Sequence, residues 1–186
     1  NYVYSNSDNV TDVGFGSGVL SFQMIKYGFQ KVFGTDTNPN AIVGLTKFMG
    51  TTKLSRKIAL DFAPLFGKFE KQTELIVFNP PWLPASFNSE NIDEAIYYSK
   101  NLFSDFFAGA KQRLLPEGKL VLLFSNLAQI TNVIKEHPIE KELAEGERFK
   151  LEHVFKKRVK TTSNKTKRDS HWRSSEKVEL WVLTNN

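Results

Sequence analysis

The sequence predicts a doubly wound α/β domain with a mostly parallel sheet and an antiparallel strand at its end. Three observations support this prediction. Strand patterns alternate with helical patterns along most of the chain, a glycine-rich turn follows the first strand, and no helix separates the last two strands. Strands that alternate with helices form parallel βαβ units with right-handed crossovers. In such a sheet, ligands bind at the carboxyl ends of the strands, where the strand order reverses.

The first half of the chain predicts four strands and two helices. Val10 to Val13 is a short apolar run that ends in glycines, and helical spacing of apolar residues follows until Gly28, an expected stop. The second helix spans 38–50, where Asn38 can cap it and Pro39 suits its first turn. The remaining strands are "KVFGTD" at 31–36, a weak "KIALDF" at 57–62 and a strong "ELIVFN" at 74–79.

The second half predicts two helices and three strands. A helix spans Leu102 to Leu115 and is closed by Pro116 and Gly118, a strand follows at 119–126, and a helix is expected around Leu127 to Lys135. The strands at 149–158 and 177–183 complete the chain. We expect these two strands to form an antiparallel pair.

Length and composition fit a single catalytic domain over 1–186. The first residue is Asn1 rather than Met, and a strand pattern begins within about ten residues, so we expect an upstream part of the chain, including a recognition region, to be missing from this sequence. A partner or an upstream domain could supply that recognition. The absence of cysteine excludes disulfides and cysteine-ligated zinc, and three scattered histidines do not suggest a metal site. No apolar run approaches the ~20 residues of a membrane span. A cytoplasmic location and no membrane contact are therefore expected.

The net charge of +5 comes from one segment. Residues 156–173 hold eight basic residues and one acid, which leaves 17 basic and 19 acidic residues elsewhere, a net of −2. Such a segment is either a solvated loop or a contact for phosphates or an acidic partner.

Three short motifs suggest a nucleotide-like ligand. In "DVGFGSG", Gly14, Gly16 and Gly18 allow a sharp turn and close approach of a ligand at the amino end of a helix. Asp36 can accept hydrogen bonds from both ribose hydroxyls of an adenosine, or cap the next helix. Asp61-Phe62 can receive an adenine amino group and pack its ring. The spacing GxGxG differs from the GxGxxG of dinucleotide enzymes, although a nicotinamide enzyme remains an alternative for this half.

Together these motifs resemble the class I S-adenosylmethionine-dependent methyltransferases, and the resemblance covers Val10 to Leu183. It implies a Rossmann-like, seven-stranded sheet with an antiparallel last strand and S-adenosylmethionine as cofactor. It also implies that "DVGFGSG" holds the methionine part, that Asp36 binds the ribose, and that Asp61-Phe62 contacts the adenine. The implied cofactor-binding residues are Asp12, Gly14, Gly16, Gly18, Asp36, Thr37, Asp61, Phe62 and Asn79.

The stretch "NPPW" after the fourth strand resembles the motif of methyltransferases that act on amide or aryl-amine nitrogens. Taken alone it is also a plausible turn, because Asn and Pro favour turns. The resemblance implies a catalytic set of Asn79, Pro80, Pro81 and Trp82. The Asn79 side-chain oxygen and the Pro80 carbonyl would accept the two N–H groups of the target, Pro81 would stiffen the chain, and Trp82 would stack on the planar group.

The substrate is left open by the sequence. "NPPWLPA" resembles the branch related to release-factor glutamine methyltransferases, but Trp82 replaces their usual tyrosine. The first hypothesis is an exocyclic amine of an RNA base, with Lys165, Lys167 and Arg168 binding the substrate. The alternatives are a glutamine side chain of a protein such as a release factor, and a cofactor-binding subunit without activity of its own.

Overall fold

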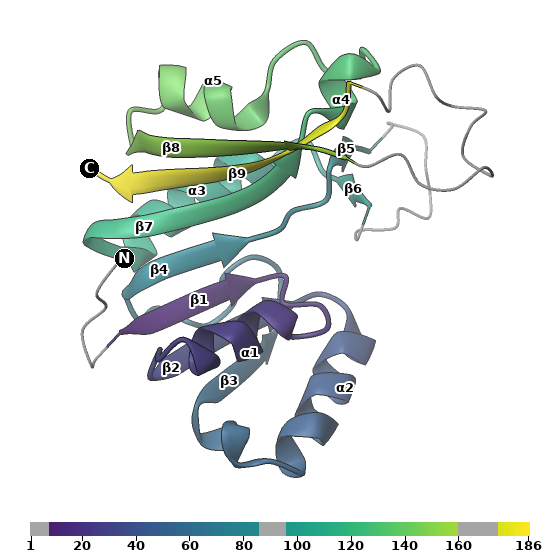
Figure 1. Ribbon diagram of the computed structural model, residues 1–186. Coiled ribbons are helices and arrows are strands. Elements are labelled where there is room, and N and C mark those ends of the chain that lie inside the picture. The colour runs from purple at the N-terminus through teal and green to yellow at the C-terminus, as the bar shows by residue number, and fades with distance from the viewer. Residues whose placement is uncertain (1–7, 86–95, 160–174) are drawn as a thin grey trace, which may run out of the picture.

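The computed structural model describes residues 8–85, 96–159 and 175–186. Its main sheet has seven strands in the order β3-β2-β1-β4-β7-β9-β8 (Figure 1). The strands of this sheet are β1 (Asn9–Val13), β2 (Lys31–Asp36), β3 (Ile58–Phe62), β4 (Thr73–Phe78), β7 (Leu114–Ser125), β8 (Phe149–Arg158) and β9 (Lys177–Asn185). The helices are α1 (Val19–Lys26), α2 (Pro39–Gly50), the 3₁₀ helix η1 (Lys53–Arg56), α3 (Leu102–Arg113), α4 (Leu127–Ile130) and α5 (Pro138–Glu145).

The pairing of the strands confirms the expected fold class. β1, β2, β3, β4 and β7 pair in parallel, whereas β9 runs antiparallel to both of its neighbours, β7 and β8. The strand order reverses between β1 and β4, which are adjacent although two strands separate them in the chain. This is the point where doubly wound sheets bind ligands.

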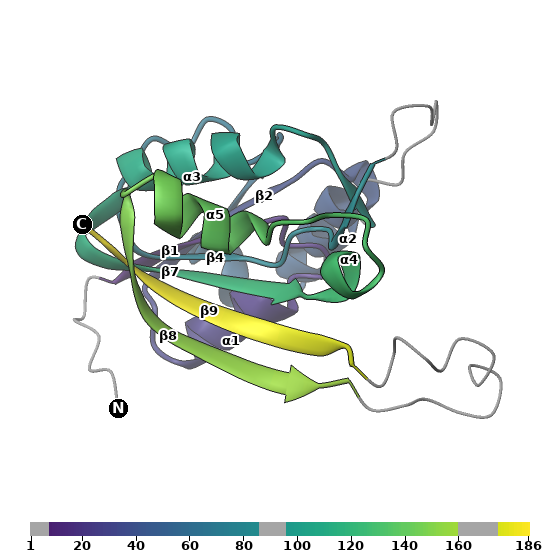
Figure 2. The same cartoon turned by 90° about the horizontal axis from the view of Figure 1, so that it is seen from above.

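Helices lie on both faces of the sheet (Figures 1 and 2). α1 and α2 cover β1, β2 and β3 on one face, and α3 and α5 lie on the other. Each face has its own core of buried side chains. The α1/α2 core is formed around Val10, Val32 and Leu45, and the α3/α5 core around Ile76, Phe106 and Leu120. Burial of these side chains holds each helix layer to the sheet.

Four expectations about the elements need correction. The helix expected to reach Leu115 ends at Arg113, because Leu114 pairs with Thr73 of β4 and starts β7. The helix expected to reach Lys135 ends at Ile130. A further helix, α5, was missed, as was a short two-stranded sheet of β5 (Leu83–Pro84) and β6 (Tyr97–Tyr98). No helix of the described residues is long and apolar enough to cross a membrane.

The basic segment is not one loop, as the sequence suggested. Lys156, Lys157 and Arg158 belong to strand β8, and the Lys156 ammonium lies 2.9 Å from the Glu179 carboxylate on β9. Only the part after β8 connects the last two strands. Lys165, Lys167 and Arg168 lie outside the described residues.

Candidate active site

Two loops that the sequence singled out leave the sheet side by side. Val13, the last residue of β1, is in register with Phe78, the last residue of β4. The glycine loop at 14–18 and the "NPPW" turn at 79–82 therefore begin at neighbouring positions on the carboxyl edge of the sheet. Asp36 and Phe62 end β2 and β3 in register with each other on the same edge. The topology thus brings the sequence motifs to one edge of the sheet.

The glycine loop adopts a backbone that requires glycine. Gly14, Gly16 and Gly18 have φ angles of 65°, 53° and 77°, in the left-handed region that side chains disfavour. A Cβ on Gly18 would lie 2.8 Å from a methyl group of Leu45, so glycine here also allows α2 to pack closely. A Cβ on Gly16 would meet no atom within 4 Å, which leaves open space where a ligand can approach the backbone.

Asp36 is held by the backbone and keeps acceptor capacity. One carboxylate oxygen accepts a hydrogen bond from the Gly16 N–H at 2.7 Å, and the other accepts one from the Asn38 N–H at 2.8 Å. Each carboxylate oxygen can accept a second bond, so two ribose hydroxyls could still be bound. The helix cap is Asn38, whose side chain accepts from the Asn40 N–H at 2.9 Å. Thr37, between these two residues, is exposed.

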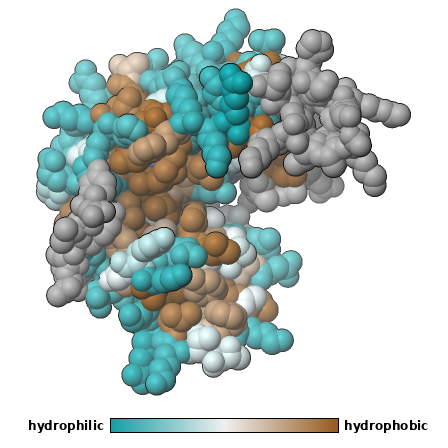
Figure 3. All heavy atoms as spheres, viewed as in Figure 1, coloured by the Kyte–Doolittle hydropathy of each residue, from teal (hydrophilic) through white to brown (hydrophobic). Residues whose placement is uncertain are grey.

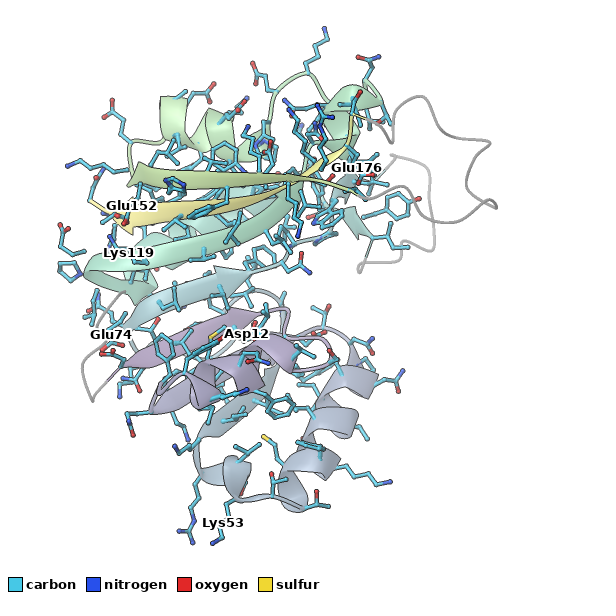
Figure 4. All side chains as sticks on the ribbon, viewed as in Figure 1. Asp12, Lys53, Glu74, Lys119, Glu152 and Glu176 are labelled. Carbon is cyan, nitrogen blue, oxygen red and sulfur yellow. The ribbon has the colours of Figure 1, made fainter. Side chains whose placement is uncertain are left out.

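Asp12 lies beneath the glycine loop, where β1 meets α1 (Figure 4). It is 1% exposed, and its carboxylate accepts a hydrogen bond from the Ser21 hydroxyl of α1. Burial raises its pKa to about 6, because the charged form loses its hydration, and the hydrogen bond from Ser21 only partly offsets this. In the described structure Asp12 joins β1 to α1 under the loop, and direct contact with a cofactor stays a prediction.

Asp61 is held in place by Lys68, whereas the neighbouring Phe62 is exposed. The Asp61 carboxylate accepts a hydrogen bond from the Lys68 N–H at 2.8 Å and forms an ion pair with the Lys68 ammonium at 3.2 Å. The backbone hydrogen bond from Lys68 lowers the pKa of Asp61. The Phe62 side chain is 59% exposed at the same edge, where its ring could pack against a planar ligand.

In the "NPPW" turn, the Asn79 side chain is open to a ligand. Asn79 is exposed and, among the described residues, makes no side-chain hydrogen bond. Pro80 is buried, and Trp82 packs partly against the α3/α5 core. The chain then enters β5, where the Ala85 N–H donates to the Tyr98 carbonyl at 2.9 Å. This pairing fixes the turn from its downstream side.

Both ends of the segment that holds Lys165, Lys167 and Arg168 are fixed near this edge. Asn126 follows the last residue of β7, and its side-chain oxygen accepts the Lys177 N–H at 2.7 Å while its amide donates to the Ser175 carbonyl at 3.3 Å. On the other side, the Val159 N–H donates to the Glu176 carbonyl at 3.1 Å. The α4 helix that begins after Asn126 contacts β5.

Sequence reasoning missed the residues that hold these motifs in place. The Ser21 hydroxyl donates a hydrogen bond to Asp12, and Lys68 pairs with Asp61. Asn126 forms hydrogen bonds with the backbone of Ser175 and Lys177 at the start of β9. Ser21 carried a weak signal, because it is a polar residue within an apolar helical pattern. Lys68 and Asn126 carried none, because their partners are distant in the chain or set by loop conformation.

Two hollows in the surface are centred away from this edge. One of about 370 Å³ lies between α1 and α2 and touches the glycine loop at Gly16 and Ser17. The other, of about 510 Å³, is bordered by α5, β8 and Trp181. Neither is lined by Asp36, Phe62 or Asn79. No group of three or more side chains suited to a metal ion occurs among the described residues.

The residues at the carboxyl edge fit S-adenosylmethionine, the cofactor that the sequence resemblance implies. The space beside Gly16 allows the backbone to contact the methionine part, and Asp36 has spare acceptor positions for a ribose. Phe62 offers an exposed ring for the adenine. The fold and this edge together define a domain of the class I methyltransferase type.

Comparison with known proteins places the chain in a family. Residues 2–153 match the family model described as the methyltransferase small domain, and the chain belongs to this family. The resemblance to S-adenosylmethionine-dependent methyltransferases is thereby confirmed at the level of the family, as is the Rossmann-like fold.

Individual relatives agree with this assignment. A putative protein N5-glutamine methyltransferase of Methanocaldococcus jannaschii is 34% identical over 100 residues, which are 53% of this chain and 49% of the relative. A ribosomal protein L11 methyltransferase of Exiguobacterium sibiricum is 35% identical over 79 residues, 42% of this chain and 25% of the relative. The chain thus spans about half the length of the first curated relative and less of the second.

The fold itself recurs in solved methyltransferases. A geranyl diphosphate methyltransferase solved in complex with S-adenosylmethionine superposes with a TM-score of 0.68, covering 98% of this chain and 80% of that chain at 15% identity. At this identity the likeness concerns the fold alone.

Proposed function

We propose that the protein is an S-adenosylmethionine-dependent N-methyltransferase that acts on a nitrogen conjugated to a planar group. The observation that carries this proposal is Asn79, an exposed and unpaired amide at the end of β4, beside the glycine loop on the next strand. A polar side chain without a partner among the described residues is available to bind a substrate. Membership of the methyltransferase small domain family supports the reaction type.

The cofactor supplies an electrophilic methyl group on a sulfonium. The glycine loop and Asp36 would hold its two ends, and Phe62 would pack against its adenine. These contacts leave Asn79 free for the acceptor, since its side chain has no partner among the described residues that it would have to give up.

Asn79 and Pro80 would position the target nitrogen. The lone pair of an amide or aryl amine is delocalised, so this nitrogen is a poor nucleophile. If the Asn79 oxygen and the Pro80 carbonyl accept its two N–H groups, its lone pair turns toward the methyl group. Trp82 would stack on the planar part of the substrate. Catalysis then rests on positioning and preorganised polarity, and no strong base is needed because the nitrogen becomes acidic once it is methylated.

For the substrate we favour a glutamine side-chain amide of a protein. The first curated relative is named a putative protein N5-glutamine methyltransferase, and the other acts by its name on a ribosomal protein. An exocyclic amine of an RNA base, the first hypothesis from the sequence, becomes the second candidate. The basic residues at 156–173 favour it, because those other than Lys156, which pairs with Glu179, can contact the phosphates of a nucleic acid whatever its base sequence.

Labelling with tritiated S-adenosylmethionine in a cell lysate separates these substrates. A labelled product that protease removes and ribonuclease leaves intact supports the glutamine substrate, and the reverse supports RNA. The variant Lys165→Ala, Lys167→Ala, Arg168→Ala gives a second measure. If RNA is the substrate, this variant should bind RNA more weakly and with a smaller salt dependence, while cofactor binding is unchanged.

A cofactor-binding subunit without activity of its own remains the third possibility. It gives no reason for an Asn79 side chain that lies beside the glycine loop and has no partner in the described part of the chain. Labelling by the purified chain, with no partner added, distinguishes it from an active enzyme.

A further inference from the structure

Positive charge gathers in a second segment of the chain, apart from residues 156–173. Residues 14–60, which run from the glycine loop into β3, contain six basic residues and one acid, Asp36. The sum over the whole chain hides this excess, because most of the acids lie in the remaining segments. Asp36 ends β2 at the carboxyl edge of the sheet, where its carboxylate accepts backbone hydrogen bonds. The six basic residues therefore have no other acid in their own segment.

Strand pairing brings three of these basic residues together at the amino edge of the sheet. Val32 of β2 is in register with Ile58 of β3, so Lys31 and Lys57, each one residue earlier, lie side by side. The Lys31 ammonium donates a hydrogen bond to the Arg56 carbonyl at 3.0 Å. The ammonium of one basic residue thus lies on the backbone of another.

The helices bring the other three basic residues to the same edge. α1 and α2 each follow a strand and return to the amino edge before the next parallel strand begins. Lys26 and Lys47 stand in the last turns of these helices, and Lys53 belongs to η1, which follows α2. Figure 4 shows Lys53 pointing away from the sheet at the η1 end of the molecule. We call this set the basic edge: Lys26, Lys31, Lys47, Lys53, Arg56 and Lys57.

The positive charge of the basic edge is not neutralised by neighbouring side chains. None of its six residues forms an ion pair with a described residue. All are exposed except the half-buried Lys31. Two acids, Asp8 and Glu74, precede or begin the neighbouring strands β1 and β4. Asp8 is 2% exposed, and a Glu74 oxygen accepts the Asn9 N–H. Like charges that lie together repel one another, so a bound polyanion would relieve the repulsion at this edge.

Exposed aromatic rings lie among these cations. Phe48, the neighbour of Lys47 on α2, is 50% exposed, and Tyr27, the neighbour of Lys26 on α1, is 77% exposed. The Phe48 ring lies 5.1 Å from the ring of Phe22, so the two helices meet there. Figure 3 shows hydrophilic residues at the η1 end of this face and hydrophobic residues beside them, over α1 and α2. Cations with interleaved aromatic rings are the combination that binds single-stranded nucleic acid.

We propose that the basic edge binds single-stranded nucleic acid. Its cations would contact the phosphates, and the rings of Phe48 and Tyr27 would stack on unpaired bases. An acidic peptide would satisfy the cations but offers no bases for the two rings. A duplex would also satisfy the cations, but its bases are stacked on one another. The charge and the rings together therefore favour a single strand.

The basic edge lies at the opposite end of the strands from the candidate active site. β2 runs from Lys31 to Asp36 in five steps, a distance of about 17 Å. A nucleic acid at the basic edge would leave the cofactor residues accessible. The proposal therefore holds whether the methylated nitrogen belongs to a protein or to RNA, and it is tested without methyl transfer.

The probe is a fluorescein-labelled oligouridine of about 12 nucleotides, within the usual length range of single-strand sites. Fluorescence anisotropy between about 50 and 200 mM salt measures its affinity and the salt dependence of that affinity. The parent protein carries Lys165→Ala, Lys167→Ala and Arg168→Ala, so that the segment after β8 contributes less to binding. The deoxythymidine oligomer of equal length should bind similarly, because the proposed contacts are to phosphates and base faces.

Neutral variants of the parent test the contribution of the cations. Lys53→Gln with Arg56→Gln should lower the slope of log affinity against log salt by about 1.4, since each phosphate contact of a single strand contributes about 0.7. Lys135→Gln with Lys150→Gln removes the same charge from exposed residues outside the basic edge and should leave the slope nearly unchanged. The first variant loses no ion pair, so its thermal melting should match that of the parent and exclude unfolding as the cause.

A second variant tests the rings. Phe48→Leu keeps an apolar contact with Phe22 but removes the face on which a base can stack, and it should weaken oligouridine binding by about tenfold. Phe155→Leu is the matched control, because Phe155 is 56% exposed on β8, outside the basic edge. It should change the affinity by less than about twofold. Circular dichroism confirms that both variants are folded.

Three results would overturn the proposal. The first is no saturable oligouridine binding at about 50 mM salt, or an equal change of slope in the two pairs of glutamine variants. The second is a Phe48→Leu protein that binds oligouridine as tightly as its parent. The third is binding of polyglutamate, but not of oligouridine, that depends on Lys53 and Arg56, which would assign the basic edge to an acidic protein.

Discussion

Asp12 carries a buried carboxyl whose ionised form destabilises the fold. Its pKa rises from 3.8 to about 6, mainly through desolvation, and the negative Asp36 adds to the rise. The folded state therefore binds the proton more tightly than the unfolded state, and stability falls as the pH rises from about 4 to 6. This rise in the pKa of Asp12 corresponds to about 3 kcal/mol of unfolding free energy.

Asp12→Asn should remove this pH dependence. The free energy of unfolding of the variant minus that of the wild type should increase by about 3 kcal/mol as the pH rises from 4 to 7. Urea unfolding at both pH values measures the difference. Glu179 contributes in the opposite direction. Burial raises its pKa, but the Lys156 ammonium at 2.9 Å and the His137 ring at 3.4 Å lower it to about 2, and this contribution is equal in both proteins. Parallel stability curves for the two proteins would show that the Asp12 carboxyl is not desolvated.

Asp36 should determine cofactor affinity. Asp36→Ala removes acceptors for the cofactor ribose and also releases the Gly16 and Asn38 N–H groups. We expect S-adenosylmethionine and its demethylated product S-adenosylhomocysteine to bind the wild type at one site per chain, and the variant to bind about 1–3 kcal/mol more weakly. Isothermal titration measures both, with circular dichroism as the folding control. Binding of a nicotinamide dinucleotide, with no binding of these two ligands, would refute the cofactor assignment.

At the scale of elements, the glycine loop and α2 are packed too closely for a side chain at position 18. Gly18→Ala would place a Cβ 2.8 Å from Leu45 in a left-handed backbone. The backbone strain and overpacking together should cost about 2–4 kcal/mol of unfolding free energy. Gly44→Ala is the matched control, since a Cβ there meets nothing within 4 Å inside α2, and it should stabilise the protein by about 0.5–1 kcal/mol.

Thermal and urea unfolding of these variants test the origin of the cost. In a Leu45→Ala protein, Gly18→Ala should lower the free energy of unfolding by less than it does in the wild type, because the clash with the Leu45 side chain is gone. A Gly18→Ala protein as stable as the wild type would mean that the loop is not held in this conformation.

The elements differ in how well the sequence predicted them, and the reasons are physical. β4 was clear because it is a continuous apolar run, as a strand buried on both faces should be. The end of α3 was placed too late because helical spacing continues through Leu114, whereas tertiary pairing with Thr73 decides its structure. α5 was missed although Pro138 stands in its first turn after His137, a recognisable start signal.

At the scale of the whole molecule, the sequence predicted where its motifs meet better than it predicted the contacts that hold them. The motifs at Asp36 and Asn79 follow strand ends, and parallel strands bring their carboxyl ends together, so their meeting could be foreseen. The pairing of Asp61 with Lys68 could not, because it depends on the conformation of the loop at 62–67.

The central claim is that Asn79 positions the nitrogen that receives the methyl group. The direct measurement is single-turnover methyl transfer from tritiated S-adenosylmethionine to the acceptor fraction of a cell lysate. Asn79→Ala should reduce the rate by about 10²–10³, the scale for removing one preorganised polar group, while cofactor affinity changes little. Asn79→Asp should be milder because it keeps an acceptor, and Trp82→Tyr should retain much of the rate because an aromatic face remains. Transfer by a folded Asn79→Ala protein at the wild-type rate would contradict the claim and reduce "NPPW" to a turn.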